Sequence, residues 1–159
     1  MEDIKKLSKL MKDIKQGFKK RLNRNTYKKL AKDIRTDIQE RVQKGYGLTD
    51  MESPKKKFKN LDSKTIAIRR RMKEAGKLSP KTAPGKSNQI ATGEMVDNLK
   101  ERTNKDGFSI EIDKKRQKVY EAQEDSGRGW LYLSKEEAKK VDETVEDAIE
   151  DTLDNLFND

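Results

Sequence analysis

Residues 90–113, IATGEMVDNLKERTNKDGFSIEID, decide the fold that the sequence predicts. After an Asp-Gly pair, the apolar residues Phe108, Ile110 and Ile112 alternate with polar ones. A period of two is the pattern of a strand with one buried face. We therefore expect these three side chains to belong to the structural core.

The predicted strand has a possible partner immediately downstream. The charged residues DKKRQ, 113–117, suit a turn, and residues 118–123, KVYEAQ, can return as a second strand. We therefore expect a small antiparallel β-sheet formed by a hairpin over residues 107–123.

The first half of the same stretch predicts a helix that the Asp-Gly pair ends with turn chemistry. Thr92 can cap the start of this helix, and Glu94 suits the positive end of the helix dipole. Met95, Val96 and Leu99 supply its buried side.

Residues 1–44 form a basic amphipathic segment. Apolar residues recur every three to four positions, with one break at the Asn-Arg-Asn of 23–25, and stop at the glycines of KGYG. This spacing predicts one long kinked helix or a pair of helices. The first stripe is Ile4, Leu7, Met11, Ile14, Phe18 and Leu22, and the second is Tyr27, Leu30, Ile34, Ile38 and Val42.

The first stripe could lie on a membrane, as lysine-rich amphipathic helices do. It lacks tryptophan and is thin, so we expect it to pack against the protein's own sheet or a neighbouring subunit. No apolar run approaches the roughly 18 residues of a membrane span, and no apolar leader is present. We expect a soluble chain without a membrane partner.

The predicted core, a helix-hairpin-helix unit over residues 89–159, ends in an acidic helix. Trp130, followed by Leu131, is expected to be a packing anchor beside the hairpin rather than a base-stacking platform, because stacking surfaces carry several aromatics. Ser134 and Glu137 have the spacing of a capping box, and an apolar stripe follows them. With the amino-terminal segment this gives one α+β domain.

Residues 45–88 form an extended loop or arm between these parts. They hold all three prolines, with many lysines and serines. One short helix around 63–75 is expected, capped by Ser63. Because so few apolar residues are available, we expect the arm to be mobile in the isolated chain and to order on a neighbour. Its expected anchors are Ile66, Ile68 and Met72.

Composition excludes several classes of protein. The chain has 42% charged and 31% hydrophobic residues, with no cysteine and no histidine. Disulfides, Cys/His zinc sites, thiol nucleophiles and Ser-His-Asp triads are therefore excluded. No phosphate-binding glycine loop is present. Glu146 and Glu150 could bind a metal or act as acid and base, but a solvated helix face is favoured. We expect no cofactor, no metal site and no enzymatic activity.

Charge changes sign along the chain. Residues 1–81 hold 26 Lys and Arg against 10 Asp and Glu, whereas residues 134–159 hold 3 against 10. The basic half attracts phosphate backbones without sequence preference. It would equally attract an acidic protein surface, including the tail of another copy.

The basic character peaks in two clusters of the arm. Lys55, Lys56 and Lys57 precede the expected short helix, which carries Arg69, Arg70 and Arg71. A basic run alone is unspecific, so both a subunit-bridging role and contact with DNA phosphates are open. We favour bridging, because forked guanidinium groups suit pairing with carboxylates.

Three phrases, in order over roughly residues 58–156, resemble the virion-morphogenesis or tail-completion proteins of tailed bacteriophages. FKNLDSKTIAIRRRM resembles the family's Thr-Ile phrase followed by basic residues. PGKSNQIATGEMVDNL resembles the loop that opens a short helix before the GFSIEID strand, and we expect its Thr92 and Gly93 to belong to the structural core. VYEAQEDSGRGWLYLSKEEAKKV resembles the second strand, the Arg-aromatic-Leu phrase and the Ser-capped last helix. The family's proline after that arginine is replaced by Gly129.

The resemblance implies a structural protein of the head–tail neck. Such a protomer would form a ring, expected to be a hexamer, around the DNA channel between portal and tail. Its implied partners are other copies, adjacent neck, portal-adaptor or tail-tube proteins, and genomic DNA in transient nonspecific contact. The implied location is the head–tail joint of the virion, after assembly in the host cytoplasm. Two other classes stay open: a basic nucleic-acid-binding module that forms no ring, and a carboxylate-metal enzyme.

Overall fold

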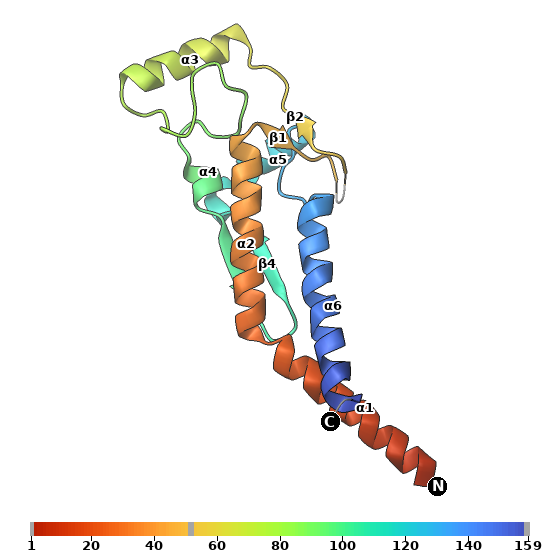
Figure 1. Ribbon diagram of the computed structural model, residues 1–159. Helices are drawn as coiled ribbons and strands as arrows, with labels where there is room; N and C mark the ends of the chain where they lie inside the picture. The colour runs from red at the N-terminus through yellow and green to blue at the C-terminus, as the bar shows by residue number, and fades with distance from the viewer. Residues whose placement is uncertain (1, 51–52, 158–159) are drawn as a thin grey trace.

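The computed structural model describes residues 2–50 and 53–157. Over these residues the chain has an α+β fold with six α-helices and two antiparallel two-stranded sheets. Figure 1 shows an elongated molecule in which α2 runs along the middle, with the arm at one end and α1 at the other. The predicted fold class is confirmed.

The amino-terminal segment forms a pair of helices. α1 spans Glu2–Arg21 and α2 spans Arg24–Gln43. Asn23 separates them because its side chain accepts hydrogen bonds from the backbone N–H groups of Asn25 and Thr26, which caps α2.

The hairpin lies one strand earlier than the sequence predicts. β4, Phe108–Glu111, pairs with β3, Lys100–Thr103, and not with residues 118–123. A tight turn joins them, in which the Asn104 side chain accepts from the N–H of Asp106. β3 shows no apolar alternation, because its half-buried residues are Glu101 and Thr103. Glu101 pairs with Arg35 of α2. The expectation of a hairpin over 107–123 is therefore wrong.

Residues 118–123 belong to a helix instead. Asp113 accepts a hydrogen bond from the N–H of Lys115 and starts the 3-10 helix η1, Lys114–Arg116. This continues into α5, Gln117–Asp125, which buries Tyr120. The helix predicted from Thr92 is also shorter than expected: α4 spans only Glu94–Asp97.

The hydrophobic core forms around α2. Its buried face packs on β3 and β4 and also contacts α4 and α6. Trp130 is fully buried and meets Tyr120 edge to face, with ring centroids 5.4 Å apart. Burial raises the Tyr120 pKa to about 12. The predicted packing role of Trp130 is confirmed. The other buried members of the core are Leu30, Ile34, Ile38, Val42, Phe58, Ile90, Val96, Leu99 and Ile112.

The predicted strand residues are buried to different extents. Ile112 is buried, whereas Phe108 and Ile110 are half-buried and pack against the core, as Leu131 does. Thr92, expected in the core, is exposed. A half-buried strand face follows because the sheet has only two strands and covers one side of α2.

The last helix, α6, spans Lys135–Phe157 and runs back along α2 to α1. Its predicted capping box is confirmed: the Ser134 N–H donates to the Glu137 carboxylate at 2.7 Å, and the Glu137 N–H donates to Ser134 Oγ at 3.2 Å. At its far end α6 lies so close to α1 that a Cβ on Gly17 would be 2.4 Å from Thr152 Cγ2. Within the described residues, no helix combines the length and apolar composition needed to cross a membrane.

Because the core lies around α2, Ile38 should contribute far more to stability than the exposed Ile68. Ile38→Ala should lower the free energy of unfolding by about 2–5 kcal/mol, because it leaves a cavity under α2. Ile68→Ala should change it by less than about 0.5 kcal/mol, because Ile68 is 56% exposed. Urea denaturation of both variants measures the difference, and equal losses would show that α2 is not the centre of the core.

Candidate functional site

The arm is fastened to the body at both ends. β1, Tyr46–Gly47, pairs antiparallel with β2, Lys56–Lys57, and so closes the first loop of the arm. Leu48 and Phe58 on either side of this ribbon are buried. Gly47 lies against the body, since a Cβ there would be 2.4 Å from both Gly129 O and Phe58 Cε1. Although the arm has few apolar residues, two of them are therefore buried where it joins the body.

The predicted short helix of the arm is α3, Ser63–Glu74. Asp62 caps it rather than Ser63: its carboxylate accepts from the Thr65 N–H at 2.7 Å and from the Thr65 hydroxyl. These hydrogen bonds lower the Asp62 pKa. A charged acceptor at a helix start is favoured by the helix dipole, which explains why Asp62 rather than its neighbour takes this position.

The three arginines of α3 do not act as one group. Arg69 is buried, and its Nη1 and Nη2 donate to the carbonyls of Lys86 and Asn88 at 2.7 and 3.0 Å. Burial, with repulsion from Arg128, lowers the Arg69 pKa. Arg69 therefore fastens α3 to the end of the arm. Arg70 and Arg71 are exposed and form no ion pair with any residue that the structure describes.

Arg128 completes this contact from the other side. Its guanidinium lies over the Phe58 ring, 5.6 Å from the centroid, and Nη2 donates to Ser87 Oγ at 3.3 Å. Burial lowers its pKa as it does that of Arg69. Both arginines thus hold the segment around Ser87, one from α3 and one from the loop before Trp130.

The lysine cluster divides in the same way. Lys56 and Lys57 lie in β2 and are exposed. Lys55 pairs with Glu136 at the start of α6, with a distance of 3.2 Å. Of the six cations in the two clusters, Arg70, Arg71, Lys56 and Lys57 therefore face outward, whereas Arg69 is buried and Lys55 is paired.

The expected anchors of the arm are only partly covered. Ile66 and Met72 are half-buried, and Ile68 is 56% exposed. α3 makes few contacts with the other helices and strands, and Arg69 fastens it to the end of the arm. The exposed apolar and basic side chains of this helix are available to a neighbour.

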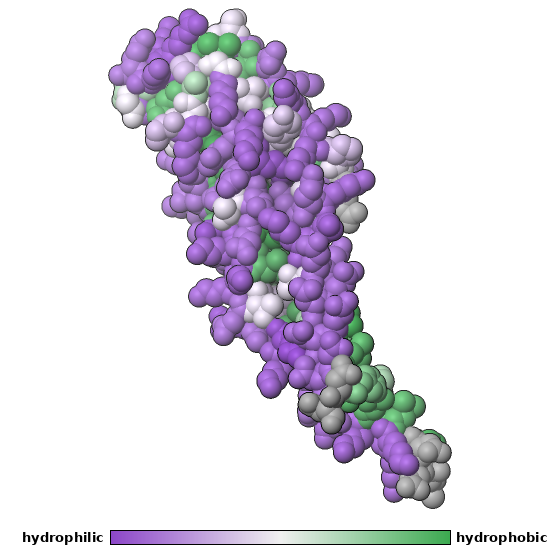
Figure 2. Space-filling view, in the orientation of Figure 1, coloured by the Kyte–Doolittle hydropathy of each residue, from purple (hydrophilic) through white to green (hydrophobic). Residues whose placement is uncertain are grey.

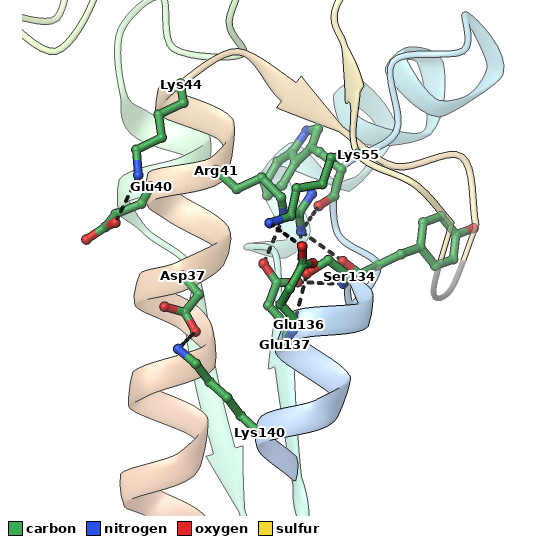
Figure 3. Close-up of polar contacts among 11 residues, drawn as sticks. Asp37, Glu40, Arg41, Lys44, Lys55, Ser134, Glu136, Glu137 and Lys140 are labelled. Atoms are coloured by element: carbon green, nitrogen blue, oxygen red, sulfur yellow. Dashed lines mark hydrogen bonds and ion pairs between the residues drawn. The ribbon is translucent and has the colours of Figure 1, made fainter. Parts of the chain in front are cut away.

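A polar cleft opens between α2 and the start of α6 (Figure 3). At its base Arg41 is 5% exposed, and its Nε pairs with Glu137 at 2.9 Å. Arg41 Nη2 also donates to the carbonyls of Trp130 and Tyr132 at 3.0 and 2.9 Å. The same Glu137 carboxylate accepts from the Ser134 N–H. One buried cation thus fixes α2, the Trp130 loop and the start of α6 together.

The mouth of the cleft carries further pairs that neutralise one another. Lys140 pairs with Asp37, and this hydrogen bond raises the Lys140 pKa. Lys44 pairs with Glu40 at 3.5 Å. Because each charged side chain labelled in Figure 3 has a partner of opposite sign, the arrangement suits a structural joint better than a catalytic centre.

Gly93 has a role that its sequence position does not reveal. Its φ of 86° is in the left-handed region, and a Cβ would meet the Asp97 carboxylate at 2.6 Å. Thr92 contributes only a long hydrogen bond, 3.4 Å from its hydroxyl to the Glu94 N–H. Glycine therefore starts α4, and threonine assists.

Sequence reasoning missed that Arg41 is buried and that Arg128 is half-buried against Phe58. Arg41 follows Ile38 by three positions and so lies on the apolar face of α2, which was the available signal. Nothing in the sequence pairs Arg128 with Phe58. Among the residues the structure describes, Asp and Glu side chains do not gather in threes around a possible metal position.

Comparison of the chain with protein-family models, curated proteins and solved structures finds no match.

The close approach at Gly47 predicts how the arm is held. Gly47→Ala should push β1 away from Gly129 and speed proteolysis within residues 48–62 severalfold, because a methyl group has no room there. The matched control is Gly85→Ala, where nothing lies within 4 Å. Timed digestion followed by mass spectrometry measures both, and identical digestion rates would show that the ribbon does not hold the arm.

The buried pair predicts that substitutions of Arg41 and Glu137 have strongly coupled effects on the free energy of unfolding. Arg41→Ala should cost about 3–5 kcal/mol, because it leaves the Glu137 charge buried without its partner. Adding Glu137→Gln should recover much of this loss, since glutamine removes the charge and keeps the cap. Lys139→Ala, from an exposed pair with Glu143, should cost less than about 1 kcal/mol. Strictly additive losses in urea denaturation would contradict the coupling.

Proposed function

We propose that this chain is a structural subunit of the neck of a tailed bacteriophage, a connector or tail-completion protein. In this proposal several copies form a ring, expected to be sixfold, between the portal and the tail. The ring surrounds the channel for genomic DNA and binds adjacent neck, portal-adaptor or tail-tube proteins. It has no catalytic role.

The observation that carries the proposal is that the three phrases resembling that family meet at one place. Phe58 and Arg69 come from the first phrase, Ser87 from the second and Arg128 from the third. Arg128 stacks on Phe58 and donates to Ser87, and Arg69 holds the neighbouring backbone. Segments that lie far apart in the sequence thus form one joint at the base of the arm, as expected if they belong to a single inherited pattern.

The surfaces of the molecule also suit a subunit of an assembly. α1 projects beyond the body with apolar side chains exposed, and α3 projects at the opposite end with exposed cations (Figure 1). A chain that worked alone would gain by covering such side chains. An assembly covers them with neighbouring subunits.

The exposed cations of the arm fit two neighbours. Arg70 and Arg71 could pair with carboxylates of an adjacent subunit, or with phosphates of DNA in the channel. Bridging is the favoured role, because Ile68 lies exposed on the same helix and an apolar side chain contributes to a protein contact but not to a phosphate contact. DNA contacts in such a channel would be weak and salt-sensitive, since the genome must pass.

A basic nucleic-acid-binding module without ring assembly is the alternative function. The observation in its favour is that Arg70, Arg71, Lys56 and Lys57 are all exposed on the arm. It does not explain the exposed apolar residues of α1. Tight, salt-dependent DNA binding by a monomer would support it over the neck proposal.

Deleting the gene from the phage that encodes it tests the proposed function directly. The lysate should contain filled heads and separate tails that fail to join, and supplying the protein in trans should restore complete particles in electron micrographs. Normal joined particles in the deletion lysate would overturn the proposal.

The arm gives a prediction within the same system. Arg70→Ala with Arg71→Ala should leave the fold intact and reduce joined particles, most visibly at raised salt, because two interface charges are lost. Lys28→Ala with Lys32→Ala, which removes two exposed charges from α2, is the matched control. Normal joining with altered DNA retention or ejection would show instead that the arginines face the channel.

A further inference from the structure

An apolar band runs along one side of the molecule at its α1 end. On α1 it consists of Ile4, Leu7 and Met11, which are 72%, 61% and 61% exposed. On α6 it continues with Ile149, Leu153 and Phe157, which are 36%, 36% and 65% exposed. Figure 2 shows hydrophobic atoms gathered along α1 and beside the lower end of α6. A surface of this kind on a highly charged protein indicates a binding site.

The chain's own contacts leave this band open. α1 and α6 run antiparallel and meet through the second half of α1, where Gly17 lies against Thr152. Arg21 then donates to the Asp151 carbonyl at 2.7 Å. The first half of α1 extends past this contact (Figure 1), so within residues 4–11 only Leu10 is half-buried and the others are exposed.

The two helices that share the band have opposite charges. α1 carries eight Lys and Arg with three Asp and Glu, whereas α6 carries three Lys and Arg with nine Asp and Glu. On α1, Lys15 lies one turn after Met11 on the same side of the helix. On α6, Glu146 lies one turn before Ile149, and Glu150 lies one turn before Leu153. The apolar row of α6 is thus bordered by carboxylates, and that of α1 mainly by lysines.

We propose that residues 4–11 of α1 in one copy of this chain bind the outer face of α6, residues 149–157, in the next copy. Apolar side chains then meet apolar side chains, and lysines lie beside carboxylates. Because the two faces differ, a head-to-tail contact between them can repeat around a ring, whereas a reciprocal two-fold pairing of the same faces would close at a dimer. The inference rests on the proposed function insofar as it names the contact that would build the ring.

Charge decides against the other occupants of the band. An anionic membrane would attract the lysines of α1 and repel the carboxylates of α6, although both helices form the same surface. A symmetric contact of α1 with α1 would place lysines against lysines. Only the α1–α6 pairing satisfies both the apolar rows and their borders.

Removing either half of the contact tests the proposal. The first variant carries Leu7→Ser and Met11→Ser, and the second carries Ile149→Ser and Leu153→Ser. Each alone should associate at least about tenfold more weakly than the unchanged protein in sedimentation, which corresponds to about 1.4 kcal/mol. Mixed together, they should form a one-to-one heterodimer, because the first retains an intact α6 face and the second an intact α1 stripe. Circular dichroism confirms that both variants are folded.

Cysteine pairs keep the test independent of any folding defect. The natural chain has no cysteine, so Leu7→Cys with Leu153→Cys introduces the only two thiols. Mild oxidation should give a ladder of covalent dimers and higher oligomers. The control pair is Leu7→Cys with Gly85→Cys, where Gly85 is exposed on the arm. It should give at least about tenfold less of the covalent oligomers.

The outcomes separate this inference from the proposed function. Monomers alone after oxidation, or an equal yield in the control pair, would overturn the contact. The contact would also be overturned if the unchanged protein stayed monomeric and bound anionic vesicles, and the variant with Leu7→Ser and Met11→Ser lost that binding. A ladder, together with normal head–tail joining in the gene deletion, would retain the contact and refute the neck function. Unjoined heads and tails in the deletion lysate, without a ladder after oxidation, would support the neck function and refute the α1–α6 contact.

Discussion

The buried pair of Arg41 and Glu137 is the constraint on which the rest of the structure depends. A charged pair in a protein interior is costly, and removal of one partner costs more than the pair contributes, because it leaves the other charge buried and unpaired. Hydrogen bonds offset much of the cost for this pair, although Arg41 Nη1 is buried without a hydrogen-bond partner. Here the cation also holds two carbonyls of the Trp130 loop, and the anion caps α6. The direction of α6 is therefore set at its first turn, by α2, and α6 leads from there to α1.

Two projecting elements follow from this arrangement. At one end, Arg69 and Arg128 hold the base of the arm through backbone carbonyls and the Phe58 ring, which leaves α3 with Arg70 and Arg71 facing outward. At the other end, α6 covers only the second half of α1. Both projections are stable because they are fixed at the body, and both carry side chains that suit a neighbour. The same buried contacts that give this small, charged chain a core thus leave exposed the two surfaces that we propose for binding neighbours.

The sequence was informative where apolar residues follow a simple period. The paired amino-terminal helices, the strand from Phe108 and the cap at Ser134 could all be predicted in this way. β3 could not, because Glu101 lies on its inner side and pairs with Arg35 at 3.0 Å, so a salt bridge replaces the apolar signal. The buried arginines were missed for a related reason: a cation on a helix is expected to be solvated, and its burial depends on carbonyls that come from distant segments.

Electron microscopy of the phage particle, at a resolution that traces α1 at the head–tail joint, tests the central claim most directly. The account predicts a closed ring in which residues 4–11 of each copy lie on α6 of the next copy, with the arm reaching an adjacent subunit. A joint built without this protein would contradict the account. So would a ring in which α1 contacts only its own body or lines the DNA channel.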